Sequence, residues 1–193
     1  MLYLVLYKRG YCAKLHMARK PLIDYVQVDK ARFLDTINAY FAWKELNAFI
    51  KSSHSRGMNF PEIISESLMC YVLDYRLNRG TYGDAMDADG NVIEAKATSN
   101  WDRDTTSFGP VTTFDRLIFI RLDQRNDVLA FYDLDMNGTT IRDVPVNKLQ
   151  SLGDQQDQGR RPRFSIVNTI IKPLNLQPIA EINLRTQKFQ VFP

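Results

Sequence analysis

Residues 84–96 read Asp-Ala-Met-Asp-Ala-Asp-Gly-Asn-Val-Ile-Glu-Ala-Lys. The dipeptide Asp89-Gly90 is a strong signal for a tight β-hairpin, so the chain is predicted to run up through Asp84 and turn. It then returns through the apolar pair before Glu94, which brings Asp84 beside Glu94. The sequence therefore predicts two strands that each carry a carboxylate, facing one another across the hairpin.

Glu94 and Lys96 stand two residues apart, and side chains at that spacing point to the same face of a β-strand. The carboxylates of Asp84 and Glu94 would repel each other unless a cation lay between them. A hard, oxygen-seeking ion such as Mg²⁺ suits that pair, and Lys96 can hold a water molecule or stabilise negative charge on a phosphate. The pattern predicts Asp84 and Glu94 as metal ligands; the alternative is a charged hairpin with an ordinary surface ion pair. Asp87 and Asp89 are assigned to the turn; the alternative is that one of them replaces Asp84 as a ligand, if the strand starts later.

The composition is that of one globular domain. The chain has 193 residues, of which 45% are hydrophobic and 24% charged, enough for one well-buried core and few for two. A net charge of +3 permits nucleic-acid binding without requiring it. Residues 1–16 are interpreted as an N-terminal extension or as an edge strand over residues 2–7, so residues 17–193 are expected to form the single domain.

Cysteine and histidine are scarce, since only Cys12, Cys70, His16 and His54 occur. This set lacks the ligand spacing of a zinc site and makes a disulfide framework improbable, as in proteins of a reducing cytoplasm. The opening apolar run is too short to cross a bilayer. We expect a cytoplasmic protein without a membrane segment.

Two helices are predicted before the hairpin. Residues 29–51 contain no Pro or Gly and repeat apolar residues at helical spacing, which indicates a long amphipathic helix, with Asp29 near its cap, in the core or at a dimer surface. A second helix is predicted from Pro61 to about Asn78. Its Glu62 and Glu66 lie on one face, where they are either solvated or where one of them is recruited by a cation.

After the hairpin, residues 114–122 and 127–134 are predicted to form two further sheet strands, and residues 180–191 a last hairpin. A short helix is predicted over residues 144–152, followed by a flexible loop over 153–159. Residues 164–171 are expected to be a buried helix or strand. These elements predict an α/β (α+β) fold with a central mixed β-sheet flanked by helices.

Basic and polar residues in two segments are candidate contacts to a polyanion. Residues 98–110 form a predicted polar loop, and a dense basic cluster follows the 153–159 loop. Arginine suits bidentate contacts with phosphates and with guanine, although most basic clusters are simply solvated. The candidate DNA-binding residues are Arg103, Ser107, Arg160, Arg161 and Arg163.

The order of a helix with Glu66, a strand opening with Gly83-Asp84 and the run Ile93-Glu94-Ala95-Lys96 resembles the PD-(D/E)xK nuclease superfamily. Gly83 stands where the motif name places Pro, so the match is less diagnostic. Residues 60–134 also look like the small type II restriction endonucleases that recognise GCNGC, through four segments. These are Ile64-Ser-Glu66, Gly83-Asp84, Ser107-Phe-Gly-Pro110 and Phe114-Asp-Arg-Leu-Ile-Phe.

This resemblance implies a restriction-endonuclease-like core and Mg²⁺-dependent, sequence-specific hydrolysis of double-stranded DNA that leaves 5′-phosphates. Asp84 and Glu94 would hold the metal, Lys96 would orient or activate the water, and Glu66 would support the metal shell. A homodimer would serve a palindromic target, with a cognate DNA methyltransferase as genetic partner. The rival interpretations are a repair or recombination nuclease of the same fold and a non-catalytic DNA-binding protein.

Overall fold

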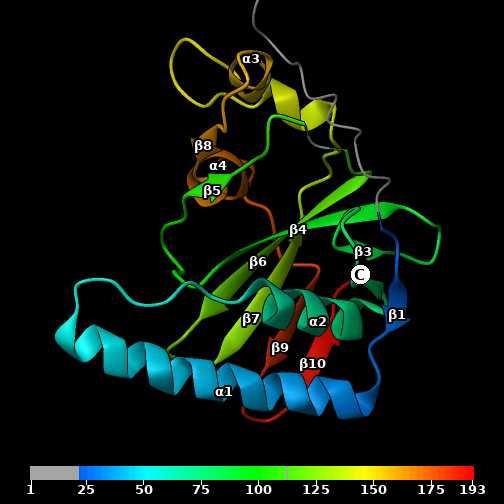
Figure 1. The fold of residues 1–193 in the computed structure, drawn as a ribbon, viewed down its shortest axis with the longest axis vertical. Coiled ribbons are helices and arrows are strands. Elements are labelled where there is room, and N and C mark those ends of the chain that lie inside the picture. Colours follow the sequence, from blue (N-terminus) through cyan, green and yellow to red (C-terminus); the bar gives the residue numbers. More distant parts are fainter. Residues whose placement is uncertain (1–21, 112) are drawn as a thin grey trace, which may run out of the picture.

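The computed structural model describes residues 22–111 and 113–193 (Figure 1). Eight of the described strands form one mixed sheet in the order β1-β2-β3-β4-β6-β7-β9-β10, in which only β4 and β6 run parallel. The predicted α/β fold with a central mixed sheet flanked by helices is confirmed. The extension predicted over residues 1–16 lies outside the described residues. The sheet strands are β1 (Tyr25–Gln27), β2 (Arg76–Asn78), β3 (Ala85–Met86), β4 (Val92–Thr98), β6 (Arg116–Asp123), β7 (Val128–Asp133), β9 (Ala180–Asn183) and β10 (Lys188–Val191).

The long predicted helix is confirmed as α1 (Lys30–Ser53). The Asp29 side chain caps it by accepting a hydrogen bond of 2.8 Å from the Arg32 amide, as expected for an aspartate at this position. The second helix, α2 (Glu62–Leu73), is shorter than predicted. Asp74 has a left-handed backbone with φ of 55° that ends the helix, and the next residues leave it to become β2.

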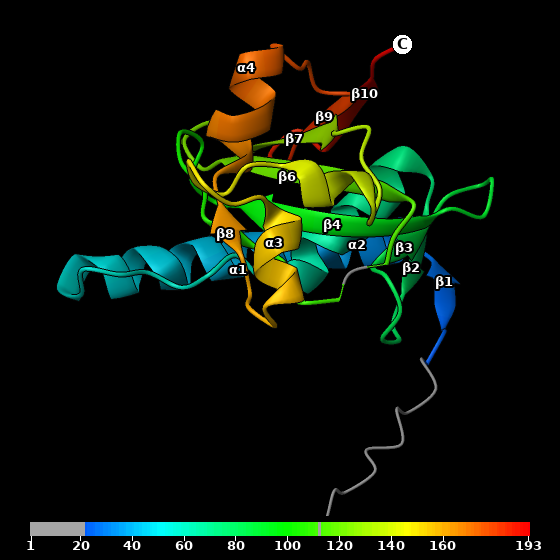
Figure 2. The same ribbon diagram turned by 90° about the horizontal axis from the view of Figure 1, so that it is seen from above.

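The central strands are buried on both faces, because β6 alternates between two hydrophobic cores. Ile118 and Ile120 belong to the core under α1 and α2. Leu117 and Phe119 belong to a second core that includes η2 (Val167–Ile171). Figure 2 shows α1 and α2 on one side of the sheet and α4 (Lys172–Leu174) on the other.

The segment before η2 differs from the sequence-based expectation. Residues 144–151 form no α-helix; the chain turns there and closes through a bridge between Pro145 and Ser151. The helix lies instead in the predicted loop, as α3 (Leu152–Asp157), because Ser151 and Asp154 form a reciprocal capping box. It follows the short 3-10 helix η1 (Thr140–Asp143). Both later predicted hairpins, β6–β7 and β9–β10, are confirmed.

A separate two-stranded ribbon joins the two polar segments. β5 (Thr106–Ser107) pairs with β8 (Arg163–Phe164) in antiparallel register, with Ser107 opposite Arg163. In Figure 1 both strands lie outside the main sheet. The fold thereby brings residues 98–110 next to the arginine cluster.

None of the helices described within residues 22–111 and 113–193 has the length and apolar character of a membrane-spanning segment.

A buried carboxylate ties α1 to the β6–β7 turn. The Asp127 side chain is fully buried, accepts hydrogen bonds from Tyr40 and Lys44, and is paired with the Arg185 guanidinium at 2.6 Å. Burial opposes ionisation of Asp127, but the hydrogen bonds from Lys44 and Tyr40 lower its pKa below the ordinary value of 3.8. The charged form of Asp127 therefore stabilises the fold at neutral pH.

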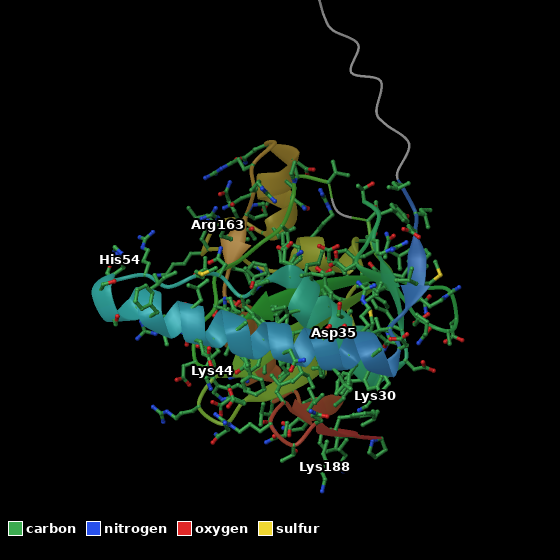
Figure 3. All side chains as sticks on the ribbon, turned by 60° about the horizontal axis from the view of Figure 1, so that its bottom comes forward. Lys30, Asp35, Lys44, His54, Arg163 and Lys188 are labelled. Atoms are coloured by element: carbon green, nitrogen blue, oxygen red, sulfur yellow. The ribbon has the colours of Figure 1, made fainter. Side chains whose placement is uncertain are left out.

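We expect Asp127→Asn to lower the free energy of unfolding by about 2 kcal/mol at pH 7. This is less than the ~3–5 kcal/mol of a fully buried pair, because Lys44 and Arg185 reach solvent. Since the folded pKa is lowered, the contribution is present above the ordinary pKa and is lost as pH falls through the folded value, so the variants converge at acid pH. Urea unfolding measures this. Asp35→Asn, on the exposed side of α1 (Figure 3), is the control; an equal loss there would contradict the assignment.

Candidate active site

The hairpin predicted from Asp89-Gly90 is present and sets the site. Ala85 pairs with Ile93 and Met86 with Val92 in antiparallel register. Gly90 has φ of 90°, a conformation that glycine adopts without strain. Buried Asp87 organises the turn by accepting hydrogen bonds from Asn91, which confirms its assignment to the turn.

Asp84 lies where β3 and β4 separate. Its amide donates to the Ile93 carbonyl, and its carbonyl accepts from the Asn78 amide, both at 2.9 Å. Backbone pairing between β3 and β4 then stops. The Asp84 side chain replaces it, because Oδ2 accepts a hydrogen bond of 2.7 Å from the Ala95 amide. The carboxylate is therefore fixed against β4 beside Glu94 and Lys96.

Glu94 and Lys96 share one face of β4, as predicted, while Ile93 and Ala95 enter the core under α2. Their side chains form an ion pair and are only 21% and 25% exposed. The Lys96 ammonium lies 5.8 Å from the centre of the buried Phe108 ring. Burial disfavours the charge on Lys96, but the Glu94 carboxylate raises its pKa, so the ammonium stays protonated. Partial burial distinguishes this pair from an ordinary surface ion pair.

Glu66 comes from α2 and lines the same cavity as Lys96. Burial, reinforced by the charges of Asp84 and Glu62, raises the pKa of Glu66 to about 8. Burial and the charge of Glu94 raise the pKa of Asp84 to about 6, although the Ala95 amide favours its ionised form. Neighbouring negative charges favour the protonated form of each carboxyl group. Glu62 is exposed one turn earlier, so Glu66 is the more enclosed of the two helix acids.

A cavity of about 390 Å³ opens between the start of α2, β4 and the β5 segment. Glu66 and Lys96 line it together with two candidate DNA contacts, Ser107 and Arg161. The exposed Arg103, Arg160 and Arg163 are not part of its lining. Arg163 is held beside the cavity by its pairing with Ser107.

Asp104 fixes this arrangement, and nothing in the sequence pattern indicated it. One carboxylate oxygen accepts from the Val167 amide at 3.0 Å, and the other accepts from the Ile166 amide at 2.8 Å and the Thr106 hydroxyl at 2.7 Å. A carboxylate that accepts several such bonds acts as a cap for the helical turn. Asp104 therefore holds the β5 segment against the start of η2 across about sixty residues of sequence.

The donor set fits a divalent metal ion. Asp84 and Glu94 offer carboxylate oxygens in a partly buried site where negative charge is crowded, which suits a hard cation. Within the described parts of the chain, no group of three or more His, Cys, Asp or Glu side chains converges to hold a metal. Mg²⁺ commonly uses one or two carboxylates and takes its other ligands from water and substrate phosphates, so the residues fit that ion.

Comparison with known proteins gives two matches. Residues 28–173 match the family described as Bsp6I restriction endonuclease. The chain is also 55% identical over 168 residues to the type II restriction enzyme Bsp6I of Bacillus sp. strain RFL6, covering 86% of this chain and 97% of that protein. No solved structure matches.

We expect Glu66→Gln to stabilise the metal-free protein at alkaline pH. A raised folded pKa means that the wild-type protein loses stability as pH rises from the ordinary value of 4.5 towards 8. Glutamine cannot ionise, so the variant should exceed the wild type by on the order of 2 kcal/mol above pH 8 and match it near pH 4. Denaturant unfolding in EDTA tests this. Glu45→Gln, exposed on α1, should show no such divergence; a constant offset at all pH values for Glu66→Gln would refute the explanation.

Proposed function

The chain belongs to the Bsp6I restriction endonuclease family and is a type II restriction endonuclease, a site-specific deoxyribonuclease, and from this we propose how its residues cut DNA. Asp84, Glu94, Lys96 and Glu66 form the catalytic site, in the manner of the PD-(D/E)xK superfamily. The observation that carries the proposal is that Glu66, Lys96 and Arg161 line one cavity, with Glu94 paired to Lys96 and Asp84 bound to the Ala95 amide between them.

Mg²⁺ is the proposed cofactor, with Asp84 and Glu94 as its protein ligands. When bound, the cation supplies Lewis-acid stabilisation of the charge that develops on the phosphate. The Ala95 amide holds the Asp84 carboxylate in place, and Glu66 supports the ligand shell from α2. The raised pKa values of Asp84 and Glu66 reflect carboxylates that favour a cation nearby.

Lys96 remains charged next to Glu94, so its proposed role is electrostatic. It orients the attacking water and stabilises negative charge on the scissile phosphate as the water attacks in line. The 3′ oxygen leaves, and the products carry 5′-phosphates. Phe108, buried behind the Lys96 ammonium, restricts its position.

Sequence readout is assigned to the two segments that the β5–β8 ribbon joins. Arg161 lines the catalytic cavity and Arg163 opposes Ser107, so a duplex at the catalytic residues would meet them. Arg103 and Arg160 are exposed on the same two segments. Bidentate contacts from arginine to guanine suit the proposed target GCNGC.

A two-fold homodimer is proposed because one catalytic site per chain must cut two strands of a palindrome. Exposed Leu46 and Phe49 on α1, which are 48% and 73% exposed, and Val191 on β10 support the two contact surfaces considered from sequence, α1 and the C-terminal segment. A cognate DNA methyltransferase would protect the host genome, and the enzyme would act in the cytoplasm on incoming DNA. Family membership argues against the repair-nuclease and non-catalytic alternatives.

Replacing Asp84 or Lys96 by Ala should reduce Mg²⁺-dependent cleavage at least about 10³-fold, because each removes a group that stabilises the transition state. DNA binding should change only a few-fold, as measured by anisotropy without metal. Asp89→Ala, on the exposed turn of the same hairpin, is the matched control and should cut at the wild-type rate. Full activity in either active-site variant would remove that residue from the mechanism.

Digestion of a sequenced plasmid with Mg²⁺ should give discrete fragments whose ends map to one short palindrome. The ends should carry 5′-phosphates, so that they are ligated without prior kinase treatment. Addition of EDTA should stop the reaction. Fragments with ends at many unrelated sequences would contradict the proposed sequence readout. Discrete ends at another palindrome would exclude GCNGC as the target but leave the rest of the proposal standing.

A further inference from the structure

A second groove, of about 870 Å³, opens next to the catalytic cavity. It lies between the C-terminal half of α1, the chain that returns from α1 towards α2, the segment after β4 and the β6–β7 turn. Asn59 and Ser99 line both the groove and the catalytic cavity. A ligand that runs through the cavity can therefore continue into the groove.

The groove presents positive charge. Four basic and two acidic side chains line it. Lys44 is engaged by Asp127, but Lys51, Arg56 and Arg125 are exposed, and within the described residues none of them lies in an ion pair. Several carboxamides share the lining, namely Asn47, Asn59, Asn100, Gln124 and Asn126. Such a mixture of cations and amide donors is suited to phosphate oxygens.

A polar network builds the floor of the groove in advance. The Gln124 side chain donates to the Ser99 carbonyl, and its backbone carbonyl accepts from Lys44 at 2.7 Å. Asn47, nearly fully buried, accepts from the Met58 amide at 2.8 Å. These contacts join α1, the returning chain and the β6–β7 turn, so the walls are fixed before any ligand arrives.

Gly57 permits the close approach of the returning chain to α1. A Cβ atom at this position would lie 2.1 Å from Asn47 Oδ1 and 2.6 Å from Lys51 Cε. A larger residue would therefore displace the Asn47 and Lys51 side chains. The glycine leaves room for both side chains where the returning chain passes α1.

The opposite side of α1 differs in character. Leu46 and Phe49 are exposed, and at 100° per residue they point away from the face that carries Lys44, Asn47 and Lys51. The apolar side fits a protein contact, whereas the groove side is polar and basic. These observations favour a polyanion as the occupant of the groove and a protein surface as the partner of the other side.

We propose that the groove binds phosphates of duplex DNA next to the scissile bond, through Lys51, Arg56 and Arg125. The inference rests on the proposed function, since it uses the DNA that the catalytic cavity cuts. These contacts position the duplex without reading bases, in contrast to the arginines of the β5–β8 segments. Each contact adds a sequence-independent, salt-dependent part of the affinity.

The test measures binding of a duplex of mixed sequence to the full-length protein in EDTA, by fluorescence anisotropy at several salt concentrations. The Lys51→Ala/Arg56→Ala/Arg125→Ala variant should lower the slope of log affinity against log salt by about 0.9 for each phosphate that the protein no longer neutralises. Arg56→Lys alone should keep the wild-type slope. Lys188→Ala, compared per charge removed, is the control and should keep the wild-type slope, because in Figure 3 Lys188 and Arg163 lie on opposite sides of α1.

An unchanged slope in the triple variant would overturn the proposal. If the slope is unchanged and sedimentation shows a different oligomeric state, the groove is a protein interface. Thermal unfolding of each variant checks that the exposed substitutions leave the fold intact. If the wild-type protein cuts DNA at defined sites and the triple variant keeps the wild-type salt slope, only the proposed role of the groove is refuted. A wild-type protein that does not cut would refute the proposed function itself.

Discussion

The early separation of β3 from β4 is the constraint on which the site depends. Backbone pairing ends at Ile93, and the next amide of β4 that faces β3, that of Ala95, is satisfied by the Asp84 carboxylate. A buried amide needs a partner. This hydrogen bond therefore replaces the next β3–β4 backbone pair and fixes the position of the Asp84 side chain. Beyond this opening Lys96 lines the cavity at the start of α2, and Glu66 of α2 lines the same cavity.

Crowded carboxylates make this opening unfavourable for folding alone. Asp84 and Glu66 both have raised pKa values, chiefly through burial, and each is raised further by neighbouring acids. Lys96 compensates Glu94, but the described residues offer Asp84 and Glu66 no ion pair. Buried, crowded carboxylates thus destabilise the fold at the point where a cation and a phosphate are proposed to bind, as is common at functional sites. The buried Asp127 cluster and the two cores stabilise the fold away from this point.

Local sequence signals predicted the parts of the fold that local chemistry determines. Asp29 as a cap, Asp89-Gly90 as a turn and the β6–β7 and β9–β10 hairpins all depend on neighbouring residues, and all are present. The errors lie where a single residue overrides the periodicity. Asp74 ends α2 by adopting a left-handed backbone, and the Ser151 capping box starts α3 inside a predicted loop.

The surroundings of the site could not be predicted, because they depend on contacts between distant residues. Asp104 looked like one more acidic residue in a polar loop, yet its carboxylate holds the start of η2 and so places Arg161 at the cavity that Lys96 lines. Arg121 stacks on Trp101 at 4.0 Å and fixes the same segment nearer β4. The first part of the segment between β4 and β6 is thereby held at two points, Trp101 and Asp104. Since it borders both the catalytic cavity and the basic groove, these contacts keep the two in one continuous surface.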